Sequence, residues 1–368
     1  MARFALFFLV CLYFTTSQSF AQDEPLKIGI AGLTHTHVHW ILGREDIGDI
    51  KIVGIAEPNR ELAQRYATQH GFSMDLVYDS LEEMIAATKP EAVTAFGTIY
   101  EHLEVVQTCA PKGIHVMVEK PLAVSLDHAK KMKALAQKHN IHLLTNYETT
   151  WYPTNHRAKE LLDNGQIGAL RKVIVRDGHR GPVKIGVNEE FLEWLQDPVH
   201  NGGGALTDFG CYGANLMTWL KKGRKPTSVT AVTQQLQAEN NPKVDDDATI
   251  ILTYEDCQAI LEPSWNWPIG RKDMELYGLT GAIYADNRNT LRVRMAEGYD
   301  GFTEDISQLE ERPYPYNDPF ALLAAVVRGT ITLNPDDLSA LENNMTVVEI
   351  LDAARESARL GKTIHLKN

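Results

Sequence analysis

Three neighbouring residues, Glu119, Lys120 and Pro121, are the best placed in this chain of 368 residues to do chemistry. They lie at the end of the apolar run His115–Glu119, which predicts a buried strand. Open α/β sheets bind ligands at the carboxyl edge of their strands, so a lysine at this edge would meet both substrate and cofactor. Its ammonium can polarise a carbonyl, or lower the pKa of an alcohol by stabilising the alkoxide. We therefore predict that Lys120 is catalytic and that Glu119 and Pro121 help to form the cofactor site.

The turn within Leu26–Trp40, LKIGIAGLTHTHVHW, is a second candidate site. Its first half predicts a buried strand, and Gly32 permits a sharp turn after that strand. A dinucleotide-binding fingerprint here would have the spacing G-x-G-x-x-G, but Thr34 and His37 occupy the second and third glycine positions. The Thr34 side chain takes up room that a pyrophosphate would use. The segment is therefore either a modified nucleotide loop, with cofactor contacts from Gly32, Thr34 and His35, or a new site in its place.

His35, His37 and His39 stand at alternate positions of the same turn. If a helix begins near Thr36, His35 and His39 lie about one turn apart on one face, a spacing that can share a divalent metal ion. In a second interpretation, His35 or His37 lines the vacated phosphate groove and contacts substrate or pyrophosphate. In a third, one or two of the histidines are polar packing groups. The sequence leaves all three interpretations open.

Glu57 ends the next apolar run, Ile50–Glu57. At this place in a dinucleotide-binding unit, an acidic side chain accepts hydrogen bonds from the adenosine ribose. The alternative is an ordinary acid at the exposed end of a strand. We predict the cofactor role for Glu57.

The elements that position these residues form two groups. From residue 26 to 146, strands alternate with helices, which predicts parallel βαβ units in a Rossmann-like, doubly wound, dinucleotide-binding domain. Asn59 and Ser80 are predicted helix caps, and Gly71 a helix end. From residue 147 to 368, helical stretches including Gly202–Leu220 precede a run of strands. This order predicts an α+β domain for substrate binding and oligomerisation, with an open, mostly antiparallel sheet, whose C-terminal helices pack back on the first domain.

Four segments together resemble the Gfo/Idh/MocA oxidoreductases, and they occur in the order that this family has. They are Val118–Leu122 (VEKPL), Gly202–Tyr212 (GGGALTDFGCY), Ser264–Trp267 (SWNW) and Glu356–Ala358 (ESA). The resemblance implies a Rossmann domain followed by an α+β domain. It also implies NAD or NADP as cofactor, and sugars or polyols as substrates.

The resemblance further implies roles for individual residues. Lys120 would be the catalytic lysine, and Asp208 and Tyr212 would form the acid–base region of the glycine-rich segment. A phenol beside an ammonium can have its pKa lowered towards the range of proton transfer, which agrees with this role for Tyr212. The alternative for Tyr212 is a core tyrosine on a helix face. By analogy with the family, a homodimer or homotetramer is expected.

Substrate contacts are expected from two further places. His179 and Arg180 follow a predicted strand in a flexible turn, where they could bind sugar hydroxyls or a carboxylate, although an exposed loop is an equal alternative. Trp151 and Trp265 could offer a surface on which a sugar stacks. The alternative for the tryptophans is core packing.

The first 22 residues have the features of a secretory signal peptide, with Arg3, an apolar stretch and a small-residue exit that predicts cleavage after Ala21. A periplasmic or secreted location is therefore expected. The apolar stretch is too short to span a bilayer, and no later run suits a membrane helix, so membrane insertion is not expected. The formal net charge of −12, without a basic stripe, makes nucleic acid an unsuitable partner.

Three functions are open on the sequence. The favoured one is an exported carbohydrate oxidoreductase with tightly bound NAD(P), in which Lys120 and Tyr212 manage the proton of a sugar hydroxyl. The second is a cofactor-independent lyase, hydratase or hydrolase on sugars or keto-sugars, metal-assisted or not, in which the THTHVH segment replaces the nucleotide loop. The third, a non-catalytic carbohydrate-binding protein, is disfavoured by the presence of both Lys120 and Tyr212.

Overall fold

The computed structural model describes residues 24–367, so the predicted signal peptide lies outside the described residues. Its strands and helices follow in chain order: β1 (Leu26–Ala31), α1 (Val38–Leu42), β2 (Ile50–Ala56), α2 (Arg60–His70), β3 (Val77–Tyr78), α3 (Leu81–Thr88), β4 (Ala92–Ala95), α4 (His102–Cys109), β5 (His115–Glu119), α5 (Leu126–His139), β6 (Leu143–Asn146), α6 (Pro153–Asp163), β7 (Lys172–Gly178), α7 (Pro182–Ile185), α8 (Glu189–Leu195), α9 (Ala205–Asp208), α10 (Gly210–Leu220), β8 (Ser228–Gln234), β9 (Asp247–Thr253), β10 (Gln258–Ser264), β11 (Arg271–Tyr277), β12 (Gly281–Ala285), β13 (Thr290–Glu297), β14 (Gly301–Gln308), α11 (Pro319–Val327), α12 (Leu341–Leu360) and β15 (Ile364–His365). Short 3₁₀ turns occur at Met74–Leu76, Ala110–Lys112 and Glu148–Trp151.

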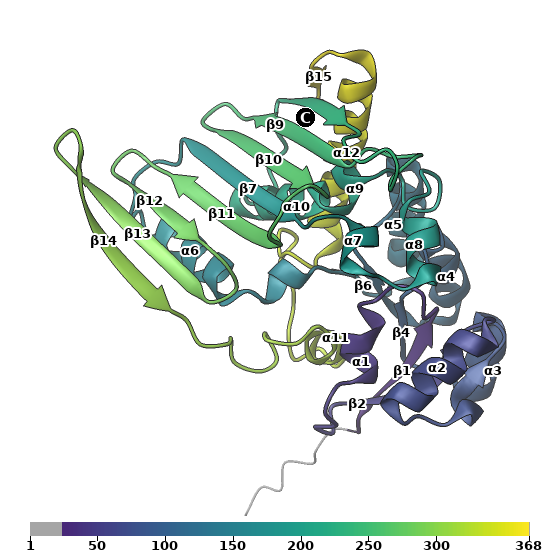
Figure 1. The fold of residues 1–368 in the computed structure, drawn as a ribbon. Helices are drawn as coiled ribbons and strands as arrows, with labels where there is room; N and C mark the ends of the chain where they lie inside the picture. Colours follow the sequence, from purple (N-terminus) through teal and green to yellow (C-terminus); the bar gives the residue numbers. More distant parts are fainter. Residues whose placement is uncertain (1–23, 368) are drawn as a thin grey trace, which may run out of the picture.

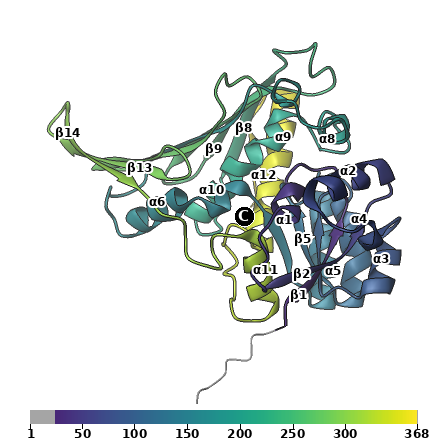
Figure 2. The same ribbon diagram turned by 60° about the horizontal axis from the view of Figure 1, so that its bottom comes forward.

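The first part of the chain forms a six-stranded sheet in the order β3-β2-β1-β4-β5-β6, with all pairs parallel. This is the doubly wound order, which reverses direction between β1 and β4 and opens a crevice at their carboxyl ends. Figure 1 shows this sheet with α2 and α3 on one side, and Figure 2 shows the layer from below. The predicted Rossmann-like fold is confirmed.

Local sequence signals explain where these helices begin and end. The Asn59 side chain accepts the backbone N–H of Leu62, and the Ser80 hydroxyl accepts that of Glu83. Gly71 closes α2 in the left-handed conformation, with φ of 77°, which a glycine adopts without strain. The predicted caps are therefore formed as expected.

The second sheet has nine strands in the order β14-β13-β12-β11-β7-β10-β9-β8-β15. Only β7 and β10 among its described pairs run parallel, so the predicted mostly antiparallel sheet is confirmed. Helices α6, α10 and α12 cover one face, and Figure 2 shows the sheet as a curved layer above them. Along β7, Val173, Val175 and Asp177 point to the covered face.

The helical stretch predicted within 202–220 is formed by two helices, α9 and α10, which meet at Phe209. Further along, α11 places Phe320 and Leu323 in the same core cluster as Ile28 and Ile30 of β1. The C-terminal part of the chain thus packs against the first sheet. Within residues 24–367, no helix is both long and apolar enough to cross a membrane.

Candidate active site

The two parts of the fold meet at a buried ion pair between Lys120, after β5, and Asp208, at the end of α9. The Lys120 ammonium donates to Asp208 Oδ1, and its Nζ lies 3.3 Å from the Asp208 carbonyl oxygen. The second carboxylate oxygen accepts the indole N–H of Trp265, at the end of β10, at 3.0 Å. Only 6% of Lys120 and 4% of Asp208 is exposed. Three elements that are distant in sequence therefore hold one charged pair in a fixed geometry.

Both partners of this pair stay ionised. Burial acts to lower the pKa of Lys120, but the Asp208 carboxylate outweighs it, and the pKa is raised above the usual lysine value. Burial acts to raise the pKa of Asp208, and Lys120 outweighs that effect, so the pKa is lowered. Lys120 is thus a permanent cation near neutral pH, suited to stabilising an oxyanion.

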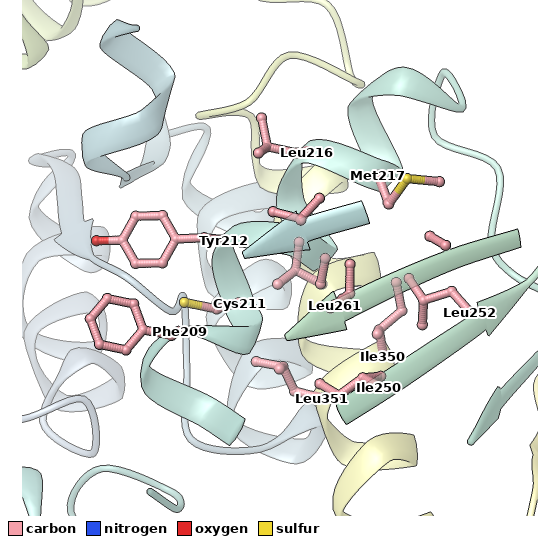
Figure 3. Packing of buried hydrophobic residues seen from close by; sticks show 14 of the residues in the cluster. Phe209, Cys211, Tyr212, Leu216, Met217, Ile250, Leu252, Leu261, Ile350 and Leu351 are labelled. Atoms are coloured by element: carbon pink, nitrogen blue, oxygen red, sulfur yellow. The ribbon is translucent and has the colours of Figure 1, made fainter. Parts of the chain in front are cut away.

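Tyr212, on α10, lies beside the ion pair with its ring 5.5 Å from that of Tyr147. Figure 3 shows the rings of Phe209 and Tyr212 side by side, directed away from the aliphatic side chains of the core. Lys120 Nζ is 5.4 Å from the centre of the Tyr212 ring. The expectation that this ammonium lowers the Tyr212 pKa is wrong: burial raises the pKa well above 10, and nearby carboxylates, Glu148 foremost, add to the effect. Tyr212 is therefore a neutral phenol, which can donate a hydrogen bond.

A second lysine, Lys272 on β11, approaches the same ring at 5.5 Å. Its ammonium is paired at 2.6 Å with Glu148, whose other oxygen accepts the hydroxyl of Tyr152 at 2.5 Å. The Lys272–Glu148 pair links the second sheet to the segment that follows β6. Sequence reasoning missed both residues, because a lysine at a strand start and an acid in a short turn carry no motif.

The residues expected to contact substrate differ from one another in their burial and in their distance from the site. His179 lies in the site, with its ring 5.0 Å from that of Phe209, and burial lowers its pKa to about 4, so it is neutral at pH 7. Arg180 is exposed and forms no ion pair with any described residue. Trp151 and Trp265 are 3% and 0% exposed, which favours the core-packing alternative for both tryptophans.

The buried tryptophans instead orient polar groups. Trp151 donates its indole N–H to Asn146 Oδ1 at 3.0 Å, and the Asn146 amide donates to Glu119 at 2.7 Å. Glu119 also bonds His37 Nδ1 at 2.8 Å. Glu119 is thus buried and held from two sides beside Lys120, while Pro121, joined to Lys120 by a cis peptide, is also buried.

The turn that contains His35, His37 and His39 does not have the helical geometry that would place His35 and His39 on one face. Helix α1 begins only at Val38, so His35 lies in the preceding turn and does not share a helix face with His39. His39 Nδ1 instead lies 2.8 Å from His70 Nε2 on α2. The predicted metal pair of His35 and His39 is therefore wrong. Among the described residues, the group whose ligand atoms come together within 4.8 Å is His35, His37 and Glu119.

Within that group, His35 already uses one ring nitrogen. Its Nδ1 accepts the backbone N–H of His37 at 3.1 Å, so the neutral ring carries its proton on Nε2. Burial lowers the His35 pKa well below 6.5, and the neighbouring His37 and Lys120 add to this effect. A metal ion at Nε2 would have to displace that proton, so the hydrogen bonding favours a packing role for His35.

Helix α8 covers the same turn. The ring of Phe191 lies 4.7 Å from the ring of His35, and that of Trp194 lies 5.8 Å from it. The Trp194 indole N–H donates to the Thr34 hydroxyl at 3.0 Å. His35 is consequently 2% exposed and lies outside the neighbouring pocket, against the expectation that it contacts cofactor. The aromatic residues of α8 were missed by sequence reasoning, although Asn188 and two acids mark the start of this helix.

A pocket of about 360 Å³ opens at the carboxyl ends of β1, β2 and β4, where the strand order reverses. Gly32, Thr34 and Glu57 line it, as expected of cofactor-binding residues. A Cβ atom on Gly32 would lie 2.7 Å from the backbone nitrogen of Gly97, so only glycine fits that turn. The other residues that line the pocket are Ala31, Ala56, Pro58, Ser80, Leu81, Glu82, Ala95, Gly97, Thr98, Glu101, His102, Glu104, Val105 and Thr108.

The pocket fits the adenosine end of a dinucleotide. Glu57 accepts the backbone N–H groups of Leu33 and Asn59, each at 2.8 Å, and a carboxylate with two such bonds keeps lone pairs for ribose hydroxyls. Burial raises the pKa of Glu57, and the two amides partly oppose it. None of the described residues that line the pocket is a lysine or an arginine, which disfavours a 2′-phosphate there.

Comparison with family models gives two matches. Residues 26–147 match the model described as "Oxidoreductase family, NAD-binding Rossmann fold", and residues 155–284 match the "GFO/IDH/MocA C-terminal domain". These ranges contain Lys120, Asp208, Tyr212, Trp265 and Lys272 of the site described above.

Two curated relatives and one solved structure illustrate what the chain is similar to. It is 32% identical over 217 residues to trans-1,2-dihydrobenzene-1,2-diol dehydrogenase of Xenopus laevis, covering 58% of this chain and 60% of the relative. It is 24% identical over 221 residues to D-xylose 1-dehydrogenase [NADP(+)] of Haloarcula marismortui, covering 60% of each. The inositol dehydrogenase homolog complexed with NAD+ from Azotobacter vinelandii superposes with a TM-score of 0.78 at 16% identity, over 94% of this chain and 98% of that one. The alignments thus span about 60% of the length of these two curated relatives, and the solved structure shows likeness of fold.

Proposed function

Because the chain belongs to the Gfo/Idh/MocA oxidoreductase family, we propose that it is a dehydrogenase that oxidises a hydroxyl of a small sugar, polyol or diol with NAD. The observation that carries this proposal is the buried Lys120–Asp208 pair, held by the Trp265 indole at the meeting of the two parts of the fold. The names of the relatives, a diol dehydrogenase and a xylose dehydrogenase, support a substrate with neighbouring hydroxyls. The cofactor-independent lyase is not favoured, since both matched models describe the oxidoreductase family.

In this proposal, bound NAD supplies the hydride acceptor, and the protein manages the charge and proton of the substrate. Lys120 donates a hydrogen bond to the reacting hydroxyl and stabilises the negative charge that grows on its oxygen as the hydride leaves. The neutral phenol of Tyr212 donates a second hydrogen bond. The hydroxyl proton passes to Lys120 as Lys120 transfers one of its own protons to Asp208, so that Lys120 stays a cation and Asp208 ends the step as the neutral acid. The Trp265 bond keeps the Asp208 carboxyl group in place.

We assign NAD in preference to NADP from the composition of the pocket. Glu57 would accept hydrogen bonds from the ribose of the adenosine, and Gly32 and Thr34 would flank the phosphates. A 2′-phosphate would meet Glu57 without a compensating lysine or arginine among the described lining residues. The like charges would repel one another in a partly buried site.

The expected signal peptide extends the proposal to location. A protein exported unfolded acquires NAD outside the cytoplasm and works only if it retains it, so we propose a tightly held cofactor in a periplasmic or secreted enzyme. We also propose a homodimer or homotetramer through the exposed face of the second sheet. Size-exclusion chromatography with light scattering tests that assembly.

The deciding experiment uses mature protein recovered from the periplasm of an expression host. The protein is denatured, and released nucleotide and metals are quantified together. We expect close to one NAD per chain after passage over a desalting column, and NADH formation with at least one of D-glucose, D-xylose, myo-inositol or a cyclic trans-diol. Lys120→Met should lower kcat by about 100- to 1,000-fold while the bound NAD persists.

Two outcomes would contradict the proposal. Protein that neither contains nor takes up NAD or NADP in a titration is not a nicotinamide-dependent enzyme. Stoichiometric metal without nucleotide would favour the cofactor-independent alternative at His35, His37 and Glu119.

A further inference from the structure

The carboxyl group of Asp177 is buried without a protein partner. This residue is the last but one of β7 and is 2% exposed, and its Oδ1 has no hydrogen-bond partner among the described residues. A buried polar group without a partner costs free energy, so such groups normally pair with protein, water or ligand. The missing hydrogen-bond partner of Asp177 Oδ1 would therefore be water or a bound ligand.

The strand pattern places Asp177 at the reaction site. It continues the inward series of Val173 and Val175, so it lies on the sheet face that carries the helices. Lys272 is its direct neighbour in the antiparallel β7–β11 pair. Side chains that oppose each other across a pair share one face, so both groups lie on the side of Tyr212, whose ring Lys272 approaches at 5.5 Å.

The charged side chains of β11 next to Asp177 form ion pairs with other residues. Lys272 donates to Glu148 at 2.6 Å rather than to Asp177. Asp273, the next residue along β11, lies on the opposite face and bonds Arg271 at 2.5 and 2.9 Å. Asp177 is thus a buried acid on the sheet face of Lys272 and Tyr212, and its Oδ1 has no hydrogen-bond partner among the described residues.

We propose that Asp177 and Lys272 form a subsite that binds a substrate hydroxyl adjacent to the one oxidised at Lys120, and so select neutral vicinal polyols. The inference rests on the proposed dehydrogenase function and adds a specificity-determining residue to it. A carboxylic acid can both donate to and accept from a hydroxyl, and the ammonium of Lys272 can donate to the same oxygen. An acidic sugar would instead bring a carboxylate towards the ionised Glu148, whose pKa is lowered to about 2 mainly by Lys272 against the effect of burial.

The protonation of Asp177 suits this role. Burial raises its pKa well above 3.8, while Lys272 and Arg271 oppose the rise and Asp273 and Glu148 add to it. The acid is therefore present in its neutral, donating form well above the pH at which an exposed aspartate ionises. The charged or titratable groups on the same face are Lys272 on β11, Glu148 and Tyr152 after β6, and Cys211 on α10, while Arg271 and Asp273 act on Asp177 from the opposite face of β11.

The test compares Asp177→Asn, Asp177→Leu and the control Asp273→Asn. Polyol affinity is measured by calorimetric titration of the NAD-loaded protein with whichever of D-glucose, D-xylose or myo-inositol the wild type oxidises, and steady-state kinetics give KM and kcat. We expect Asp177→Leu to raise the Kd and KM about tenfold with kcat within threefold of wild type. Asp177→Asn should lose less affinity and abolish the rise of KM that the wild type shows as pH increases and Asp177 ionises. Asp273→Asn should leave both constants unchanged.

The outcomes separate this inference from the function on which it rests. Wild-type protein that binds neither NAD nor any of these polyols overturns the function, and the subsite with it. A wild type that turns over a polyol, with Asp177→Leu at wild-type Kd and KM, overturns the subsite alone. Equal losses in Asp177→Leu and Asp273→Asn also overturn it, because they would reflect the sheet rather than a contact with substrate. A deoxy analogue lacking the adjacent hydroxyl should be insensitive to Asp177→Leu.

Discussion

At the scale of single residues, the site depends on a charge pair that is costly to bury. Two desolvated charges are stable only when their remaining lone pairs and protons are also satisfied. Asp208 meets this condition through Lys120 on one oxygen and Trp265 on the other. Trp265 therefore acts through Asp208 as a positioning residue, and we expect its loss to alter the chemistry more than the binding of substrate.

Trp265→Phe is predicted to lower kcat by about 10- to 100-fold with little change in KM, because hydrogen bonds to charged groups contribute about 1.5–3 kcal/mol. The indole bond also helps to lower the Asp208 pKa, so its loss should shift the acidic limb of the pH–rate profile to higher pH. Steady-state kinetics between pH 5 and 9 measure both effects. Trp267→Phe is the matched control, since its indole lies 3.4 Å from the Glu262 carbonyl and touches neither charge. An unshifted profile would show that Trp265 serves packing alone.

The sequence identified Lys120, Asp208 and Tyr212 as members of one site, because each lies in a recognisable motif. It assigned the wrong physical state to Tyr212, since the effect of burial on a phenol depends on what packs around it in three dimensions. Lys272 and Asp177 could not be found in the same way. Their importance follows only from strand register, which places them opposite each other across β7 and β11.

At the scale of elements, α8 connects the two parts of the molecule over the nucleotide turn. Its cap residue, Asn188, donates to the Tyr66 hydroxyl of α2 at 2.7 Å. Glu190 of α8 forms an ion pair with Arg65, which also lies on α2. At its other end Trp194 bonds Thr34 and packs on His35. Figures 1 and 2 both show α8 next to the first domain, beyond the edge of the second sheet. Such a bridge would slow the escape of a nucleotide bound at this turn.

Trp194→Ala is predicted to increase the dissociation rate of NAD about tenfold or more, because it removes the bond to Thr34 together with a large aromatic contact. Stopped-flow displacement of NAD, or the NAD content left after repeated desalting, measures the change. Glu190→Gln is the control, since its pair with Arg65 is largely exposed and such pairs contribute about 0–1 kcal/mol. Equal retention of NAD by Trp194→Ala and wild type would contradict the bridging role.

At the scale of the whole molecule, the sequence predicts the two sheets better than the contacts between the two parts of the fold. Strand–helix alternation and capping residues specify the parallel sheet, because these signals are local in the chain. The Lys120–Asp208 and Lys272–Glu148 pairs join residues about 90 and 120 positions apart. Local periodicity carries no information about contacts over such separations, so the pairings at this junction appear only in the folded molecule, although motifs had named Lys120 and Asp208.

The same burial that shapes the site makes the folded molecule sensitive to acid. Burial lowers the pKa of His102 and of His156 to about 4, from the usual 6.5. The unfolded chain therefore takes up these two protons as pH falls below about 6.5, whereas the folded chain takes them up only near pH 4. Stability is present above pH 6.5 and is lost as pH falls through this window.

We predict that lowering the pH from 7 to 5 costs about 2 kcal/mol of folding free energy for each of these two histidines, by linkage of their pKa shifts. The apparent Tm, followed by circular dichroism, should fall over this range. His102→Gln should remove the part of this fall that comes from the protonation of one histidine. His365→Gln, at an exposed position on β15, should leave the pH dependence unchanged. A Tm that stays constant from pH 7 to 5 would mean that both histidines take up their protons at the same pH in the folded and the unfolded chain. That result would require partners for the His102 ring, whose Nε2 has none among the described residues.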